Sequence, residues 1–382
     1  MMATLFWISA LLIAYTYLGY PLWLFTQKKI SLKPVTKGLY EPTVSVVIAA
    51  RNEEQAILRR LENLLGQTYP PEKLQIIVVS DGSTDRTVET VQQLSENRVM
   101  VIPLETNQGK AVALNTGINA AQGEIIVFTD ARQQFEPDVL QQLVANFADE
   151  KVGCVSGELL FLKDVDSTIQ AEIGAYWKYE KWIRKAESAT GSVVGATGAI
   201  YAIRRNLYQA LPQGTLLDDV LTPMRIVIQG YRTIFDETAI AYDVVSKNTS
   251  QEWKRKVRTL AGNWQLLSLQ PALLIPVINP NCFRFISHKL MRLIVPAALV
   301  TLLLSSFFLT GPFYLGILLL QLLSYSAALI GCSLPTARRF RLINLSYFFL
   351  VMNAAATAGF WRWITGRATT AWQPAYSRAT SA

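Results

Sequence analysis

The chain has 382 residues, a formal net charge of +8 and 51% hydrophobic residues. This length allows one large domain or two of ordinary size. The positive charge is gathered beside hydrophobic segments, so it indicates membrane topology and argues against a nucleic-acid partner. The three cysteines form no CxxC pair, which predicts buried thiols in a reducing compartment and excludes a cysteine zinc motif.

The first 26 residues contain no charged side chain. Within them, "LFWISALLIAYTYLGYPLWLF" is long enough to cross a bilayer. A cleavable signal peptide is the alternative, but the segment is long and lacks a basic start and a small-residue cleavage site. We therefore expect residues 1–27 to form a retained transmembrane helix.

Strand and helix patterns alternate in the segment 40–264. Apolar runs rich in β-branched residues predict strands at 44–50, 74–81, 98–105 and 124–130. Each run is followed by a helical pattern of about 12 residues, which is typical of a parallel sheet covered on both faces. The sequence therefore predicts an α/β fold with a Rossmann-like, mostly parallel sheet.

Polar residues follow these strands, at the sheet edge where ligands bind in such folds. Acidic, basic and neutral residues are brought together there. They are Ala50, Arg51, Asn52 and Glu53 after the first strand, Asp81 after the second, Lys110 and Asn115 after the third, and Asp130 and Arg132 after the fourth. A phosphorylated, hydroxyl-rich ligand would use both signs of charge.

The common phosphate-binding motifs are incomplete. Gly109-Lys110 resembles the end of a P-loop, but Ala111 replaces the Ser or Thr and Leu104 replaces the first Gly. The glycines of "GSVVGATG" (191–198) have the wrong spacing for GxGxxG. These departures argue against a P-loop ATPase and a dinucleotide oxidoreductase.

The choice of general base is narrow. His288 is the only histidine and lies in a basic stretch beside a hydrophobic segment, so a His-dependent triad is excluded from the sheet domain. A carboxylate is then the first candidate, ahead of Lys, Tyr or Cys. Asp218 and Asp219 begin a predicted helix, where acids either complement the helix dipole or act chemically. A metal site without His would use oxygen ligands and suit Mg²⁺ or Mn²⁺.

Three further hydrophobic segments follow at 293–311, 313–334 and 342–364, and we expect transmembrane helices over 293–364. Gly311-Pro312 predicts a tight hairpin between the first two. The preceding segment, 265–292, is expected to contain an interfacial helix and a basic juxtamembrane stretch. Residues 365–382 form a tail.

Basic clusters predict the orientation of these segments. They follow the first hydrophobic segment (Lys28, Lys29, Lys33, Lys37), precede the second (284–292) and lie before the last (337–341). The positive-inside rule puts all three in the cytoplasm, which predicts a multi-pass protein of the inner (plasma) membrane with a cytoplasmic sheet domain. Four complete spans would put Arg362, Arg367 and Arg378 outside, so the last segment spans, re-enters or lies in the interface.

Several segments match a known group when they are taken in order: "VSVVIAARNEE", "VVSDGSTDRT", "NQGKAVALNTGI", "FTDA", "TGAIYAIRR", "DDVLTPMRIVIQGYR" and "KRKVRTLAGNWQ". The chain resembles the membrane-embedded family 2 glycosyltransferases, which include cellulose, hyaluronan, chitin and poly-N-acetylglucosamine synthases. The resemblance covers roughly residues 40–290 and the arrangement of hydrophobic segments.

The resemblance implies a GT-A fold and inverting transfer of a hexosyl or N-acetylhexosaminyl group from a nucleotide diphosphate sugar, expected to be a UDP-sugar. It implies catalytic residues Asp219, as general base, and Asp218. The implied nucleotide-sugar-binding residues are Ala50, Asn52, Glu53, Asp81, Lys110, Asp130 and Arg132, with Asp130 also the metal ligand for Mg²⁺ or Mn²⁺. The implied acceptor-binding residues are Thr197, Gly198, Arg255 and Arg258.

Two departures from the family pattern bear on the chemistry. Gln-x-x-Arg-Trp becomes the segment 255–259, which keeps Arg258 and has Thr259 in place of the Trp. Asp-X-Asp becomes Asp130-Ala131-Arg132. Arg132 either supplies positive charge to the diphosphate, or it points outward and a following acid, Glu136 or Asp138, completes the metal site.

The expected acceptor is a growing exopolysaccharide or a lipid-linked acceptor, with membrane lipids around it. Accessory subunits of a polysaccharide export system are possible further partners. Transfer of a single sugar to a polyprenyl or other lipid acceptor is the alternative that the missing Trp favours. A sugar-nucleotide-binding pseudoenzyme is a further alternative, because Arg132 is unusual at its position.

Overall fold

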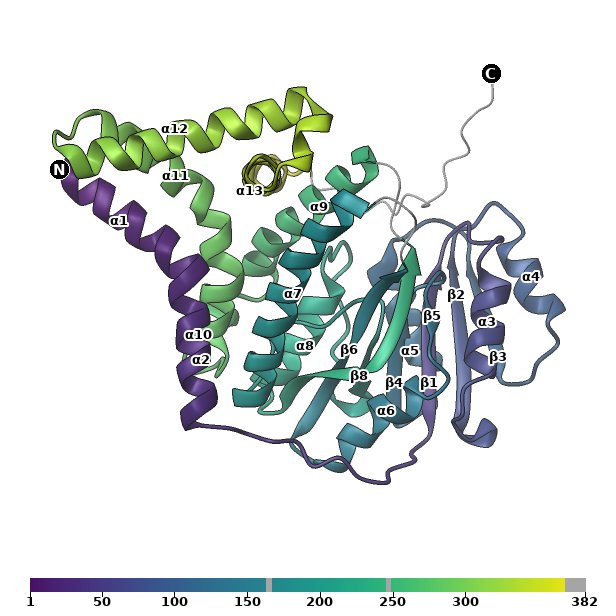
Figure 1. The fold of residues 1–382 in the computed structure, drawn as a ribbon. Coiled ribbons are helices and arrows are strands. Elements are labelled where there is room, and N and C mark those ends of the chain that lie inside the picture. The colour runs from purple at the N-terminus through teal and green to yellow at the C-terminus, as the bar shows by residue number, and fades with distance from the viewer. Residues whose placement is uncertain (163–166, 245–248, 368–382) are drawn as a thin grey trace, which may run out of the picture.

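The computed structural model describes residues 1–162, 167–244 and 249–367, and its sheet has eight strands (Figure 1). The strands are β1 (Val44–Ala50), β2 (Leu74–Asp81), β3 (Val99–Leu104), β4 (Ile125–Thr129), β5 (Gln134–Phe135), β6 (Val152–Leu162), β7 (Tyr201–Arg204) and β8 (Arg232–Val244). Their order in the sheet is β3-β2-β1-β4-β7-β6-β8-β5.

The first four strands form the parallel half of the sheet. β1 pairs with β2 and β4, and β2 pairs with β3, in parallel register. The bounds agree with the sequence-predicted strands to within one residue, because each strand is an uninterrupted apolar run. Parallel pairing brings the carboxyl ends of β1, β2 and β4 to one edge, which confirms the predicted placement of the polar residues that follow them.

The other half of the sheet is mixed, and the sequence did not predict its strands. β7 is antiparallel to β4 and β6, β5 is antiparallel to β8, and β6 is parallel to β8. The ladder between β6 and β8 shifts register beside Gly153 and again beside Gly157. Glycine inside a strand pattern often marks such a bulge, and it weakens the periodicity from which strands are predicted.

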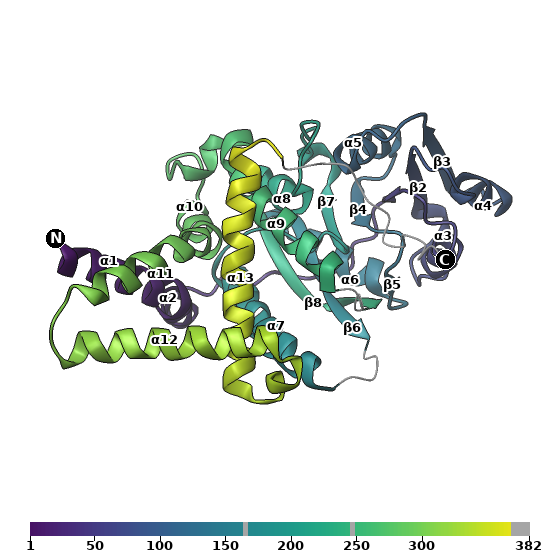
Figure 2. The same cartoon turned by 90° about the horizontal axis from the view of Figure 1, so that it is seen from above.

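Helices cover both faces of the sheet (Figures 1 and 2). In the sheet domain they are α3 (Ile57–Leu65), α4 (Thr87–Gln93), α5 (Lys110–Ala120), α6 (Val139–Ala145), α7 (Ser167–Thr190), α8 (Asp218–Ile228) and α9 (Thr249–Leu269). Alternate residues of β1 enter different cores. Val46 and Ile48 pack with α3 and α6, whereas Val47 and Ala49 pack with α5 and α8. This two-sided burial explains why the strands are apolar throughout.

The chain also has four helices that are long and apolar enough to cross a membrane: Met2–Ile30, Cys282–Phe307, Pro312–Ser333 and Arg341–Ile364. The first comprises α1 (Met2–Ala14), a π-helical turn (Tyr15–Gly19) and α2 (Tyr20–Ile30). Pro21 lies one residue inside α2. Because proline lacks an N–H and its ring crowds the preceding turn, it accounts for the π-helical turn there.

The helices after α9 differ from the prediction in one respect. The stretch expected to be an interfacial helix is a single 3₁₀ turn (Pro271–Leu274) followed by irregular backbone. Proline at 271, 276 and 280 prevents a continuous helix there. The basic stretch 284–292 then lies inside the helix Cys282–Phe307, which comprises α10 (Cys282–Phe285), a π-helical turn (Ile286–Leu290) and α11 (Met291–Phe307).

The last two helices are α12 (Pro312–Ser333) and α13 (Arg341–Ile364). The predicted hairpin at Gly311-Pro312 is present, and Gly311 has a φ of 119°, which favours glycine. Of the cysteines, Cys154 and Cys282 are buried as expected, but Cys332 on α12 is exposed. The prediction of a buried thiol was therefore wrong at Cys332, which faces outward from an apolar helix.

α13 runs across α12 and lies along α9. Figure 1 shows α13 end-on beside a side-on α12, and Figure 2 shows α13 lengthwise. A Cβ at Gly359 would lie 2.8 Å from the backbone N of Ala261, so the two backbones approach each other closely. Further along, Trp264 stacks on Trp363 at a centroid distance of 5.6 Å. α13 is thereby fixed to the sheet domain.

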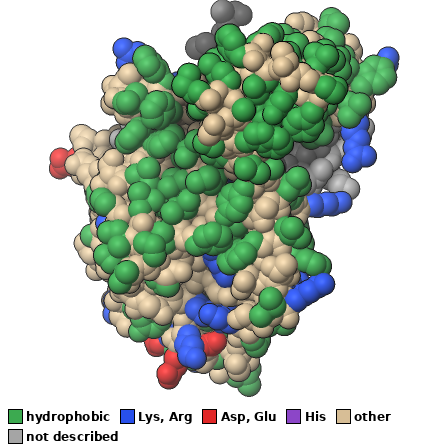
Figure 3. Space-filling model, turned by 90° about the vertical axis from the view of Figure 1, so that its left-hand side faces the viewer, with side chains coloured by type: hydrophobic (Ala, Val, Ile, Leu, Met, Phe, Trp, Pro, Cys, Tyr) green, Lys and Arg blue, Asp and Glu red, His purple; other side chains and the backbone are tan. Residues whose placement is uncertain are grey.

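The surface beside these helices is apolar. Figure 3 shows hydrophobic side chains over much of that face, with lysine and arginine at its margins. The exposed apolar residues come mainly from the four long helices and include Leu11, Leu22, Val300, Leu320 and Leu323. Such a large exposed apolar surface is typical of a membrane protein.

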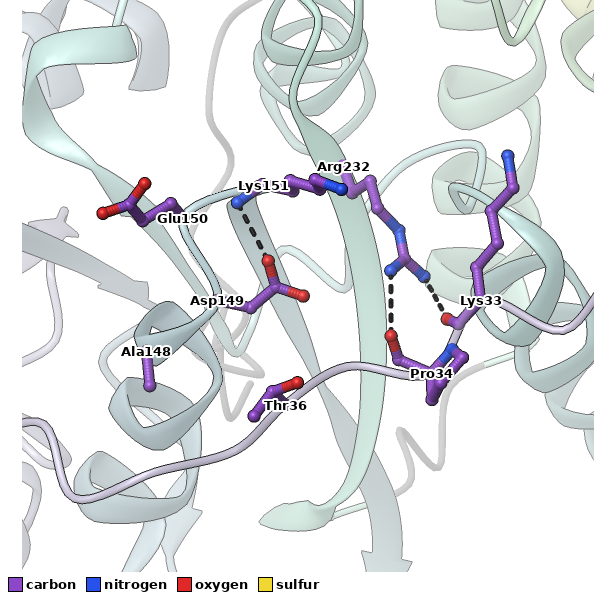
Figure 4. Close-up of a pocket in the computed structure, with 8 residues that line it drawn as sticks. All are labelled: Lys33, Pro34, Thr36, Ala148, Asp149, Glu150, Lys151 and Arg232. Carbon is purple, nitrogen blue, oxygen red and sulfur yellow. Dashed lines mark hydrogen bonds between the residues drawn. The ribbon is translucent and has the colours of Figure 1, made fainter.

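A cavity of about 790 Å³ lies at the opposite edge of the sheet from the polar cluster (Figure 4). It is lined by the linker that follows α2, by residues 148–151, which precede β6, and by Arg232, the first residue of β8. Arg232 donates hydrogen bonds to the carbonyls of Lys33, at 2.8 Å, and Pro34, at 3.4 Å. We interpret this cavity as a gap beneath the linker. Arg232 hydrogen-bonds to backbone carbonyls of that linker, and no predicted site residue lines the cavity.

Candidate active site

Lys110 lies between two predicted site residues. Its Nζ is 2.9 Å from Oδ1 of Asp130 and 3.7 Å from Oδ2 of Asp218. Burial lowers the pKa of Lys110, but the two carboxylates more than compensate and raise it above its ordinary value. Lys110 is thus a permanent cation that joins the end of β4 to the start of α8.

Asp81 positions the loop that carries Lys110. It is fully buried, and its carboxylate accepts hydrogen bonds from the backbone N–H of Gln108, at 2.7 Å, and of Gly109, at 2.9 Å. Gly82 has a φ of 63°, and a Cβ there would lie 2.5 Å from the backbone N of Asn107. Only glycine allows this close approach. A direct contact between Asp81 and a nucleotide base stays a prediction.

The turn after β1 is fixed by the turn after β2. Ala50, the last residue of β1, is buried. Asn52 has a φ of 54°, which is uncommon for a residue other than glycine. Its side-chain oxygen accepts a hydrogen bond from the N–H of Thr84 at 2.8 Å, and its own N–H donates to Ser83 at 3.1 Å. The two strand ends are therefore held together.

Arg132 faces Glu53. Its Nε lies 3.9 Å from Oε1 of that carboxylate, and the Arg132 side chain is 36% exposed. Burial raises the pKa of Glu53 to about 7, against the opposing effect of Arg132. Arg132 therefore lies over the strand ends, where its charge can reach an anionic ligand.

The alternative in which Glu136 or Asp138 completes a metal site stays a prediction, and each of these carboxylates already accepts a hydrogen bond. Glu136 accepts a hydrogen bond from the Tyr242 hydroxyl at 2.6 Å, and Asp138 accepts one from Gln142 at 2.9 Å. Within residues 1–162, 167–244 and 249–367, no three His, Cys, Asp or Glu residues are grouped as metal ligands. Asp130 is the carboxylate that could hold a metal, together with oxygens supplied by a ligand.

Asp219 follows Asp218 in the first turn of α8. Burial and then the neighbouring Asp218 carboxylate raise the pKa of Asp219 to about 6, while Lys110 and Lys289 oppose this effect. One Asp218 oxygen, Oδ2, is buried without a hydrogen-bond partner among the described residues. A carboxylate with a pKa near 6 is a competent general base near neutral pH.

Thr197 and Gly198 lie beside Asp219. A Cβ at Gly198 would lie 3.0 Å from Oδ2 of Asp219, so glycine leaves the carboxylate accessible on this side. The N–H of Thr197 donates to Ser156 at 2.8 Å, and the Thr197 hydroxyl accepts a hydrogen bond from Arg184, also at 2.8 Å. The predicted acceptor loop and the predicted base are thus brought together.

The two predicted arginines of α9 have different surroundings. Arg258 lies one turn before Gly262, which packs against Leu217 just ahead of Asp218. The Nε of Arg258 is buried and has no hydrogen-bond partner among the described residues. Arg255, by contrast, is 60% exposed and pairs with Glu252 at 2.6 Å. Only Arg258 of the pair is placed near the start of α8.

His288 is buried and is not available as a base. Its ring nitrogens lie 2.8 Å from Oε1 of Glu187 and 3.1 Å from Oε2 of Glu180, both on α7. Arg292, one turn later, pairs with Glu180 as well. The basic stretch assigned to membrane topology therefore also docks the helix Cys282–Phe307 onto α7.

Sequence reasoning missed three polar residues near Asp219: Ser156, Arg184 and Lys289. Ser156 lies in β6, a strand that was not predicted because glycines interrupt its sequence pattern. Arg184 lies in α7, a helix with no family motif. Lys289 was counted only as part of a basic cluster.

Comparison with known proteins agrees with this geometry. Residues 45–211 match the family model "Glycosyl transferase family 2". The probable glycosyltransferase YdaM of Bacillus subtilis is 29% identical over 243 residues, which cover 58% of this chain and 55% of that protein. The poly-beta-1,6-N-acetyl-D-glucosamine synthase of Staphylococcus aureus is 25% identical over 229 residues, or 59% and 55% of the two chains. The alignment thus spans about half the length of these curated relatives.

A solved structure extends the similarity. The mannosyltransferase PcManGT from Pyrobaculum calidifontis, in complex with GDP-Man and Mn²⁺, superposes with a TM-score of 0.74 and 25% identity. The match covers 95% of this chain and 99% of that one, so it includes the long apolar helices. The GT-A-like fold expected from the sequence is confirmed, and the expected family is matched over residues 45–211. The chain carries a glycosyl transferase family 2 domain, with β1, β2, β4 and the residues Asp81, Lys110 and Asp130 inside the matched segment.

Proposed function

We propose that this protein transfers a sugar, with inversion, from a nucleotide diphosphate sugar to an acceptor held at the membrane. The observation that carries the proposal is the position of Lys110 between Asp130 and Asp218, with Asp219 next in the chain. In this proposal Lys110 is the cation for the leaving diphosphate, and Asp219 is the carboxylate for the attacking hydroxyl.

The reaction places separate demands on the two groups. The acceptor oxygen forms a bond to the anomeric carbon while the bond from that carbon to the diphosphate oxygen breaks, and the electron pair leaves with the diphosphate. Lys110 and Arg132 stabilise the negative charge that develops there. Asp219 accepts the hydroxyl proton as the new bond forms, which its pKa of about 6 allows at neutral pH.

A divalent cation fits this site with one protein carboxylate. Asp130 is partly exposed at the end of β4, and one of its oxygens is hydrogen-bonded to Lys110. Mg²⁺ and Mn²⁺ are often held by one or two carboxylates plus substrate phosphates, so Asp130 and the donor would supply the ligands. When bound, the ion would neutralise diphosphate charge alongside Lys110.

The acceptor is proposed to be lipid-linked, and transfer of a single sugar is the form we favour. Thr259 is exposed where the polymer-forming relatives have Trp, and Trp264 is occupied by stacking on Trp363. By the positive-inside rule we propose that the site faces the cytoplasm from the inner membrane.

A donor panel tests this function. Purified protein in neutral-lipid nanodiscs is incubated with Mn²⁺ or Mg²⁺, a membrane-lipid extract and one UDP- or GDP-sugar at a time. Release of the nucleotide diphosphate with one donor, and a product heavier by one sugar, is the expected result. A ladder of masses would instead identify a polymer. Absence of release with every donor would favour a nucleotide-sugar-binding pseudoenzyme.

A further inference from the structure

Arg184 on α7 has no carboxylate partner among the described residues. Its guanidinium donates hydrogen bonds to the hydroxyls of Thr197, at 2.8 Å, and Ser156, at 2.6 Å. Its other contact is the ring of Phe235, whose centroid lies 4.5 Å away. Burial lowers the pKa of Arg184 below its ordinary value. A cation held by neutral oxygens and a ring gains most from an anionic ligand.

The carboxylates around Arg184 are already paired with other groups. Glu158 pairs with Lys181 at 2.7 Å. Glu180 pairs with Arg292 and His288, and Glu187 accepts hydrogen bonds from His288 and Tyr20. The other nearby acid is Asp219, the proposed base, and no described carboxylate forms an ion pair with Arg184 within 4.0 Å.

Lys289 supplies a second cation from the helix Cys282–Phe307. No described residue forms a hydrogen bond with its ammonium group or an ion pair within 4.0 Å. The preceding residue, His288, contacts Glu180 and Glu187, which lie four residues before and three residues after Arg184 on α7. The two cations therefore face one region, one from the sheet domain and one from a candidate membrane span.

This region adjoins the proposed base through a short chain of contacts. Arg184 binds the Thr197 hydroxyl, and the next residue, Gly198, lies against Asp219 with its missing Cβ 3.0 Å from Oδ2. An acceptor whose hydroxyl reaches Asp219 would place its next group near Arg184 and Lys289. Because the helix of Lys289 has no charged residue from Leu293 to Phe307, that group would lie close to where a lipid chain begins.

We propose that Arg184 and Lys289 bind a phosphate group of the acceptor, which carries the reacting hydroxyl on one side and a lipid chain on the other. The inference rests on the proposed function and narrows its acceptor to a phosphorylated lipid carrier. A planar guanidinium and an ammonium together match the free oxygens and negative charge of a phosphate diester or a diphosphate.

Ligand binding tests the site without requiring turnover. The protein in neutral-lipid nanodiscs is titrated with farnesyl phosphate, with farnesol and with inorganic phosphate. We expect farnesyl phosphate to bind at least tenfold more tightly than farnesol. Arg184→Gln and Lys289→Gln should each weaken it about tenfold. Lys185→Gln, whose exposed side chain pairs with Glu237, is the matched control and should bind as wild type does.

The remaining outcomes separate the alternatives. Equal binding of farnesol and farnesyl phosphate, or unchanged binding in both Arg184→Gln and Lys289→Gln, overturns the proposal. Binding of inorganic phosphate as tight as that of farnesyl phosphate would assign the same site to soluble phosphate. Arg184→Lys keeps the charge and should recover part of the affinity if Arg184→Gln is poorly folded. A parallel titration with nucleotide sugars distinguishes failure of this site from failure of the proposed function.

Discussion

At the scale of single residues, the proposed mechanism depends on the ionisation of Asp219. Its pKa of about 6 lies above the ordinary value of 3.8, so the carboxylate is protonated and inactive as a base below that pH. We expect the turnover rate to rise with pH through about 6 and to level off above 7. In Lys289→Gln the midpoint should move upward, because a cation that favours the ionised form is lost. A pH–rate profile at saturating donor measures both.

Gly198 provides a second prediction at this scale. In Gly198→Ala the new Cβ would lie 3.0 Å from Oδ2 of Asp219 and force the carboxylate or the loop to shift. Small displacements of a catalytic group are costly, so turnover should fall about tenfold or more. The Kd of the nucleotide sugar should not change. Gly316→Ala, with no atom within 4 Å of its Cβ, is the control. Wild-type turnover in Gly198→Ala would contradict the placement of the acceptor.

At the scale of elements, α9 links the membrane helices to the start of α8. Its Gly262 packs on Leu217, and its Gln265 side chain accepts a hydrogen bond from the Leu216 N–H at 2.9 Å. On the other side, Gly359 of α13 packs against Ala261. A movement of α13 would therefore be transmitted through α9 to Leu216 and Leu217, directly before Asp218.

Gly359→Leu tests this link. The leucine side chain has no room against α9, where a Cβ alone would approach to 2.8 Å, so α13 should separate from α9 and turnover should fall severalfold. Gly316→Leu on α12 adds the same side chain where nothing lies within 4 Å and should be neutral. Equal activity of the two variants, measured at matched protein levels, would show that α13 does not support the site.

The elements also show what could be predicted from sequence. β1, β2 and β4 were predicted because both faces of each strand are buried, which leaves an unbroken apolar run. The site residues at their ends followed from parallel topology. β6 was missed because Gly153 and Gly157 form bulges that break its pattern. Arg184 was missed for another reason: its role depends on Ser156 and Thr197, which are distant in sequence and meet only in the folded sheet.

At the scale of the whole molecule, the position of α13 explains an apparent conflict of charge. Four full spans would separate Arg362 and Arg367 from the other basic clusters. In the structure Trp363 lies against Trp264 of the sheet domain, so both arginines remain on the side of that domain. Arg378 lies outside the described residues. Length and composition alone make α13 a candidate span, and its packing along α9 argues for the interface.

Cysteine labelling checks this topology. In a chain with Cys154, Cys282 and Cys332 replaced by serine, Thr365→Cys should react with an impermeant maleimide from the same side of the vesicle as Lys37→Cys. Lys37 precedes β1 and marks the side of the sheet domain. Reaction of the two cysteines from opposite sides would mean that α13 spans the membrane.

The central claim is that Asp219 takes the acceptor proton in transfer from a nucleotide sugar. The most direct measurement compares wild type and Asp219→Asn for product formation and for nucleotide-sugar affinity in the same preparation. Asparagine keeps the shape and cannot accept the proton, so transfer should fall by about 10²- to 10⁴-fold. The Kd of the donor should stay within a few-fold of wild type. Transfer by Asp219→Asn at the wild-type rate would contradict the assignment of the base.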